Sequence, residues 1–230
     1  LNLMNAAKAK RTFSEARYVL ETRGVWATLP LAVRRHIEMG QHGKIPETLK
    51  PGDPRLRRVS TELLGGNGPS LAAAAAAARR LGFRPVLLTS CLEGEAREAG
   101  RVLASILRSC VENGRPGSPP VCLLAGGETT VTVEGSGSGG RNQELVLSAA
   151  TALASFPVSA VVAALGTDGI DGASSAAGAV ADETTIARAR HLGLAPPEAF
   201  LAANDSSGFF GPLSDLIVTG PTGTNVADLV

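Results

Sequence analysis

The stretch that decides the fold is VCLLAGGETTVTVEGSGSGGRNQELVLSAATALASFPVSAVVAALGTDG, residues 121–169. It opens with an apolar run over residues 121–125 and closes with a second one over residues 160–165, and glycines follow each run. Between them, residues 141–154 are rich in apolar side chains and hold neither proline nor glycine, which predicts a helix. A strand, a loop, a helix and a strand in this order are typical of an α/β layered domain.

The same alternation continues upstream of this stretch. An alanine-rich helix over residues 71–81, a strand over residues 84–89 and an amphipathic helix over residues 93–111 are predicted in turn. Within the amphipathic helix, Glu93 and Arg97 are spaced to form an ion pair across one turn.

Downstream, the sequence predicts a helix over residues 184–192 and a strand over residues 213–218. The alternating segment 129–134 reads as one more strand at the surface. Together these elements predict a layered α/β/α fold with a mostly parallel or mixed sheet. Ligands bind beyond the carboxyl ends of the strands in such folds.

The two ends of the chain suggest how it is organised. Residues 1–20 predict a helix, and a second short helix begins at Pro30. Residues 112–120 hold two glycines and three prolines, and are the best candidate for a linker between domains. The chain begins with Leu1 rather than Met, and we interpret it as a fragment of a longer protein.

The composition limits the class of protein and its partners. Of 230 residues, 44% are hydrophobic and 19% charged, as expected for a globular protein. The net charge of +1 argues against nucleic-acid binding, and no stretch approaches the ~20 apolar residues of a membrane span. Three cysteines without metal-ligand spacing, and no apolar signal segment, predict a cytoplasmic protein.

Glycine-rich loops with polar residues follow the predicted strands and are the candidates for chemistry. Successive backbone N–H groups in such loops bind anions, and a helix N-terminus that carries an arginine strengthens the site. The candidate substrate- or phosphate-binding residues are Gly126, Gly127, Glu128, Gly139, Gly140, Asn204, Asp205, Thr222, Gly223, Thr224 and Asn225.

Each of these loops also has a purely structural explanation. Asp168 and Asp171 follow a buried strand and are suited to hold Mg²⁺, but aspartates beside glycines also form ordinary turns. Residues 135–140 fit a flexible hairpin tip as well, and Asn204 with Asp205 fits a helix cap. The residues by themselves indicate an α/β protein with a site for a small anionic molecule.

Four strings of the sequence together match the pattern of a known family. They are LLAGGETTVTVEGSGSGGRNQELVL at 123–147, ALGTDGIDGASSAAGAVAD at 164–182, ANDSSGFF at 203–210 and DLIVTGPTGTNVADL at 215–229. These strings resemble the C-terminal part of the glycerate 2-kinase family, some of whose members are labelled hydroxypyruvate reductase. Residues 13–110 look like the same family. The resemblance implies that residues 1–115 are an incomplete Rossmann-like N-terminal domain and residues 116–230 a C-terminal glycerate-kinase-type domain.

The resemblance implies ATP-dependent phosphorylation of D-glycerate at its 2-hydroxyl, with Mg²⁺, in a cleft between two domains. Arg141 matches the family's active-site arginine and would stabilise charge on the transferred phosphoryl group. Asn142 and Glu144 belong to the same motif and are candidate catalytic residues, and Asp168 and Asp171 would hold the metal. The partners that the resemblance implies are glycerate and a nucleotide. It leaves open whether the chain forms a homo-oligomer.

The sequence departs from the family in ways that bear on activity. An active-site lysine and a serine- and glycine-rich loop of the family's N-terminal half are not found, and the strand that usually follows residues 223–225 is missing. We therefore predict little or no kinase activity for the isolated chain. Two other classes remain: an oxidoreductase acting on hydroxypyruvate, although no dinucleotide fingerprint is present, and a non-catalytic binding module.

Overall fold

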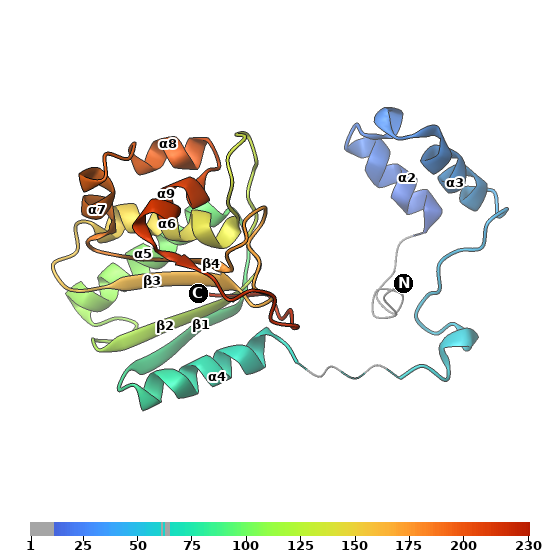
Figure 1. The fold of residues 1–230 in the computed structure, drawn as a ribbon. Helices are drawn as coiled ribbons and strands as arrows, with labels where there is room; N and C mark the ends of the chain where they lie inside the picture. Colours follow the sequence, from blue (N-terminus) through green and yellow to red (C-terminus); the bar gives the residue numbers. More distant parts are fainter. Residues whose placement is uncertain (1–11, 61, 63–64) are drawn as a thin grey trace. The chain divides into compact units, whose positions relative to one another are not determined.

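The computed structural model describes residues 12–60, 62 and 65–230, which divide into the compact units Leu1–Leu63 and Leu64–Val230 (Figure 1). The first unit is helical. Its elements are α2 (Phe13–Thr22), η1 (Trp26–Thr28), α3 (Leu31–Gln41) and η2 (Pro54–Leu56). Thr12 and Glu15 form a capping box that fixes the start of α2. The predicted helix over residues 1–20 is described only from its second half, because residues 1–11 lie outside the described part.

The second unit has a six-stranded sheet at its centre (Figure 1). The strands are β1 (Arg84–Leu92), β2 (Val121–Gly127), β3 (Val161–Gly166), β4 (Gly178–Asp182), β5 (Leu216–Ile217) and β6 (Asp228–Leu229). Their order in the sheet is β1-β2-β6-β3-β4-β5. Strands β1 and β2 pair in parallel, and the other neighbouring pairs are antiparallel. The sheet is mixed, as predicted, but antiparallel pairing dominates it.

Helices cover both faces of this sheet and complete the predicted α/β/α layering. They are α4 (Asn67–Arg80), α5 (Ala96–Asn113), α6 (Arg141–Leu153), α7 (Thr185–His191), α8 (Pro197–Ala202) and α9 (Ser206–Leu213). Helix α4 packs on β1 and β2, while α6 packs on β3 and β4 and is itself covered by α5. Figure 1 shows α4 on the opposite side of the sheet from α6.

The core is centred on α6, which is buried from Asn142 to Ala150. Gly100 in α5 lies against the backbone of α6, where an added Cβ would collide with the carbonyl oxygen of Leu145. Small residues therefore bring the two helices together, and Phe209 and Phe210 of α9 are fully buried in the same core.

The sheet differs from the sequence-based predictions in four places. Residues 129–134 form no strand, and their β pairing is limited to an isolated bridge between Thr130 and Glu95. Strand β4 was not predicted, because glycine and alanine dominate its sequence. The predicted strand over residues 213–218 shrinks to β5, because α9 extends to Leu213. The prediction that no strand follows residues 223–225 is wrong, since β6 lies between β2 and β3.

The boundary between the two compact units falls after Leu63. The boundary predicted at residues 115 and 116 lies inside the second unit, because β1 pairs with β2 across it. The Rossmann-like nature of residues 1–115 stays a prediction. No described helix has the length and apolar character needed to cross a membrane.

Candidate active site

Arg141 begins α6, and an acid from the end of the chain holds its guanidinium. Arg141 Nε and Nη2 donate to Asp228 Oδ2 and Oδ1 at 2.6 and 2.9 Å, and Nη2 lies 3.3 Å from Glu128 Oε1. The Asp228 side chain is 5% exposed, whereas the Arg141 side chain keeps 29% exposure. The hydrogen bond to Asp228 raises the pKa of Arg141, so the guanidinium stays charged. The pair holds the guanidinium in one orientation and leaves part of it open to solvent.

Asp171 caps the start of α6. Its Oδ1 accepts from the backbone and side-chain amides of Asn142 at 3.0 and 3.2 Å, and its Oδ2 accepts from the Gln143 backbone at 2.9 Å. Burial raises the pKa of Asp171, and these hydrogen bonds act in the opposite direction. The backbone amides of Asn142 and Gln143 are therefore engaged by Asp171, which leaves the predicted anion site at this helix start without them. The Asn142 side chain takes part in the same cap.

The glycine-rich loop over residues 135–140 is packed against the turn that precedes α9. Added Cβ atoms at Gly135, Gly137 and Gly139 would collide with Ala203, Asp205 and Ser206 respectively, so every second residue of the loop faces this turn. Ser136 and Ser138 are exposed. The glycines of this loop therefore allow close packing, which neither the hairpin-tip nor the phosphate-loop interpretation had proposed.

The side chains of Asn204 and Asp205 accept hydrogen bonds from the backbone of this loop and of the residue before it. Asn204 Oδ1 accepts the backbone N–H groups of Glu134 and Gly135 at 2.8 Å each, and Asp205 Oδ1 accepts that of Ser138 at 3.0 Å. Asn204 is buried in a left-handed conformation, with φ of 52°, which asparagine tolerates better than most residues. The predicted helix-cap hydrogen bond is not formed by Asp205, although it precedes α9.

Glu144 is buried, and both of its carboxylate oxygens have partners. Arg97 Nε donates to Oε1 at 2.8 Å, and Asn204 Nδ2 donates to Oε2 at 3.2 Å. Arg97 therefore pairs with Glu144 across two helices, and not with Glu93 as the sequence had suggested. The carboxylate of Glu144 belongs to a closed polar network beneath the loop.

A cavity of about 500 Å³ lies over these residues. Its walls include six of the residues that the sequence singled out. They are Glu128, Gly139, Gly140, Arg141, Glu144 and Asn204. Thr129, Thr130, Val131, Val133, Gly172 and Ala173 form much of the rest. Two further candidates, Gly126 and Gly127, do not line it: added Cβ atoms there would collide with Asn67 and with the backbone of Leu92.

The remaining candidates form a second cluster. Asn225 Nδ2 donates to Asp168 Oδ2 at 3.2 Å, and the Thr222 backbone donates to the Asp168 carbonyl at 3.2 Å. Thr222 Oγ1 donates to the Thr167 carbonyl at 2.5 Å. None of Asp168, Thr222, Gly223, Thr224 and Asn225 lines the 500 Å³ cavity. Gly166 joins the two clusters, because Asp168 Oδ1 and Asp228 Oδ1 both lie within 4 Å of where its Cβ would be.

The proposed pair of metal ligands does not fit Mg²⁺. Both oxygens of Asp171 are engaged in the α6 cap, and Asp168 Oδ1 accepts the backbone N–H of Ile170 at 3.1 Å. Among the described residues, no group of three or more histidine, cysteine or acidic side chains is placed to hold a metal ion. We therefore assign no metal-binding role to the carboxylates of Asp168 and Asp171.

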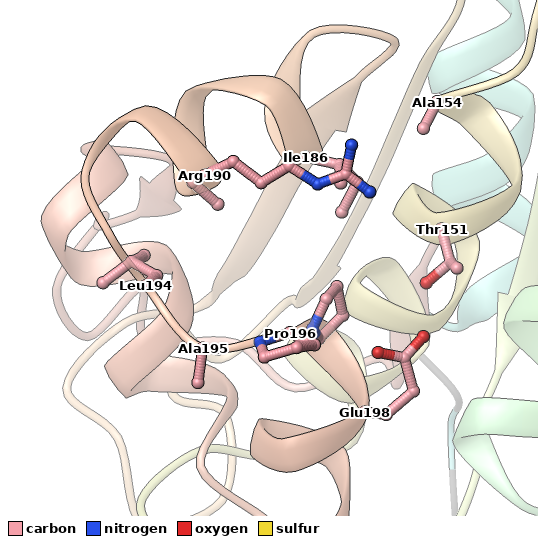
Figure 2. A pocket seen from close by; sticks show the side chains of 10 residues that line it. Thr151, Ala154, Ile186, Arg190, Leu194, Ala195, Pro196 and Glu198 are labelled. Atoms are coloured by element: carbon pink, nitrogen blue, oxygen red, sulfur yellow. The ribbon is translucent and has the colours of Figure 1, made fainter.

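A smaller hollow of about 200 Å³ lies between the end of α6, α7 and the start of α8 (Figure 2). Figure 2 shows Arg190 and Glu198 on its rim, with Pro196 between them. None of the residues predicted from the sequence lines it. We therefore place the candidate active site at the larger cavity.

Two residues of this site were missed in the sequence. Asp228 has a signal in retrospect, because it is an acid within the otherwise apolar segment 226–230. Arg97 has none, because the local spacing suggested Glu93 as its partner and nothing nearby in the sequence points to Glu144, 47 positions away.

Comparison with known proteins identifies relatives for nearly the whole chain. The MOFRL family matches residues 121–228. The glycerate 2-kinase of Pyrococcus horikoshii is 42% identical over 97% of this chain and 50% of its own length. A putative hydroxypyruvate reductase of Agrobacterium vitis is 41% identical over 95% of this chain and 48% of its own.

A solved structure agrees with these sequences. The glycerate kinase of Thermotoga maritima superposes with a TM-score of 0.76 and 39% identity, over 95% of this chain and 49% of that chain. The chain thus spans about half the length of the relatives it matches. Residues 121–228 match the MOFRL family, and almost the whole chain is similar in sequence to one half of the glycerate 2-kinases.

Proposed function

We propose that this chain supplies the Arg141 side of a glycerate 2-kinase active site, for the ATP-dependent phosphorylation of D-glycerate to 2-phosphoglycerate. The observation that carries the proposal is a guanidinium that Asp228 fixes at the wall of a 500 Å³ cavity. A pre-oriented, permanently charged donor is what a transferred phosphoryl group requires, because negative charge is spread over its oxygens.

In the reaction, the 2-hydroxyl oxygen of glycerate forms a bond to the γ-phosphorus of ATP. The bond from that phosphorus to the bridging oxygen breaks, ADP leaves with the electron pair, and the hydroxyl proton passes to solvent. Arg141 would offset the charge on the phosphoryl oxygens or on the glycerate carboxylate. We propose ATP as the phosphoryl donor and Mg²⁺ as an ion bound to the nucleotide phosphates. A cytoplasmic location remains a prediction.

The test is a calorimetric titration of the chain with 2-phosphoglycerate, together with a coupled assay with D-glycerate and MgATP. We expect binding by the unmodified chain that Arg141→Ala weakens about 10- to 100-fold, because the ligand loses charge-assisted hydrogen bonds to the guanidinium. Because the chain spans about half the length of its relatives, we expect little or no turnover from it by itself. Equal binding by both proteins would remove Arg141 from the site. Consumption of a nicotinamide cofactor with hydroxypyruvate would favour the oxidoreductase instead.

A further inference from the structure

We infer that Asn204 is a positioning residue for the candidate active site, and that Glu144 and Arg97 lock it in place. The inference rests on the proposed function for the identity of the ligand, and on the contacts of residues 132–138 for everything else. In this inference Glu144 orients the Asn204 amide and does not act as a catalytic base.

Asn204 attaches one end of the cavity wall, residues 132–135, to the core. Its Oδ1 accepts two successive backbone N–H groups, those of Glu134 and Gly135, and its Nδ2 lies 3.3 Å from the Thr132 carbonyl. Residues 132–135 form no strand ladder, so these hydrogen bonds take the place of sheet pairing. Neighbouring Thr129, Thr130, Val131 and Val133 line the cavity. The segment before α5 holds Thr130 through the backbone of Gly94, so Asn204 fixes the other end of this wall, next to Val133.

Glu144 sets the orientation of the Asn204 amide. Its Oε2 is 3.2 Å from Asn204 Nδ2, which forces the other amide atom, Oδ1, toward the two loop N–H groups. Arg97 holds the opposite oxygen of Glu144 at 2.8 Å and donates a second hydrogen bond to the Leu201 carbonyl at 3.1 Å. The chain of contacts therefore runs from α5 through α6 to the turn before α9, and ends at the cavity wall.

The electrostatics agree with a positioning role. The Glu144 side chain is 3% exposed, and its charge is matched by the guanidinium of Arg97. A base that accepts a proton from a substrate hydroxyl needs a carboxylate oxygen open to that hydroxyl. Both oxygens of Glu144 instead accept hydrogen bonds from protein groups, as a fully satisfied buried network requires.

Hydrogen exchange of the whole chain, read at the amides of Glu134 and Gly135, tests the attachment. We expect Asn204→Ala to speed their exchange about tenfold or more, with the amides of α6 and the sheet unchanged. Asn204→Gly removes the same side chain but relieves the left-handed backbone, so it gives the same result if the alanine variant folds poorly. Asn113→Ala, at the exposed end of α5, is the matched control. Unchanged exchange at both amides in the alanine and glycine variants would overturn the inference.

Exchanging the hydrogen-bond donor and acceptor between residues 204 and 144 tests the role of Glu144. Asn204→Asp places a second carboxylate 3.2 Å from Glu144 and should weaken 2-phosphoglycerate binding about 10- to 100-fold by displacing the wall. Adding Glu144→Gln returns a donor to that contact, with donor and acceptor exchanged, and should restore most of the affinity. A double variant no better than Asn204→Asp would refute the locking role. If the unmodified chain fails to bind 2-phosphoglycerate, the proposed function fails, while the exchange measurements still decide the positioning of the loop.

Discussion

The guanidinium of Arg141 and the carboxylate of Asp228 meet in a two-point hydrogen bond, at 2.6 and 2.9 Å, although 87 positions separate them in the chain. Arg141 lies at the first position of α6, and Asp228 lies in the short strand β6 between β2 and β3. Strand β6, the last strand along the chain, thus supplies the acid that orients the candidate catalytic arginine. Stability and ligand binding are consequently coupled at this contact.

Asp228→Asn should lower the free energy of unfolding by about 1–3 kcal/mol, because it breaks a charge-assisted pair whose acid is buried. Binding of 2-phosphoglycerate should weaken as well, because Arg141 loses its fixed orientation. Denaturant unfolding and calorimetry measure the two effects. Glu128→Gln is the matched control: its side chain is 66% exposed, so stability should change by no more than about 0.5 kcal/mol. Equal stability of Asp228→Asn and the unmodified chain would contradict the assigned role.

Asp171 should make the stability of the chain depend on pH. Its pKa is raised from the ordinary value of 3.8, so between that value and the raised one the native state binds more protons than the unfolded chain. The stability due to Asp171 should therefore fall as pH rises through this interval. Asp171→Asn keeps one oxygen for the α6 cap and removes the titration. The unmodified chain should lose stability relative to this variant between about pH 4 and the raised pKa, as measured by urea unfolding at several pH values. A difference that stays constant with pH would show that burial does not govern this carboxyl.

Gly135→Ala should destabilise the chain by about 1–3 kcal/mol, because the added methyl group would collide with the backbone of Ala203. Ser136→Ala changes the adjacent, exposed residue of the same loop and should change stability by less than about 0.5 kcal/mol. Thermal melting of the two variants checks the alternation. If both tolerated the substitution equally, the loop would be loosely attached rather than packed.

Gly100→Ala should also be destabilising, by about 1–3 kcal/mol, since its methyl group would meet the Leu145 carbonyl oxygen. The direction matters, because alanine in the middle of a helix normally stabilises by about 1 kcal/mol relative to glycine. Gly68→Ala in the first turn of α4 has open space around it and should be neutral or stabilising. Chemical denaturation of both variants gives the comparison, and a gain in stability at position 100 would mean that α5 and α6 are less closely packed than described.

The sequence determined those parts of the protein that depend on local patterns. Apolar runs bounded by glycines located β2 and β3, and the uninterrupted run after residue 140 located α6, because a helix or a buried strand depends mostly on its own residues. The family resemblance, carried by the residues around Arg141, was confirmed by the relatives. Local pattern was also enough to place Arg141 at the beginning of a helix and near a sheet end.

Tertiary structure decided how those parts are connected and what the polar residues do. Asp171 caps α6, Asn204 fastens the cavity wall and Asp228 orients Arg141, and each of these contacts joins residues at least 28 positions apart. A side chain that satisfies a distant backbone amide has the same sequence signature as one that binds a ligand, because both are polar residues beside glycines. Strands β4 and β6 were missed for a related reason. Their stability comes from the ladders of neighbouring strands, and segments of five and two residues are too short to show the alternation that is typical of a strand.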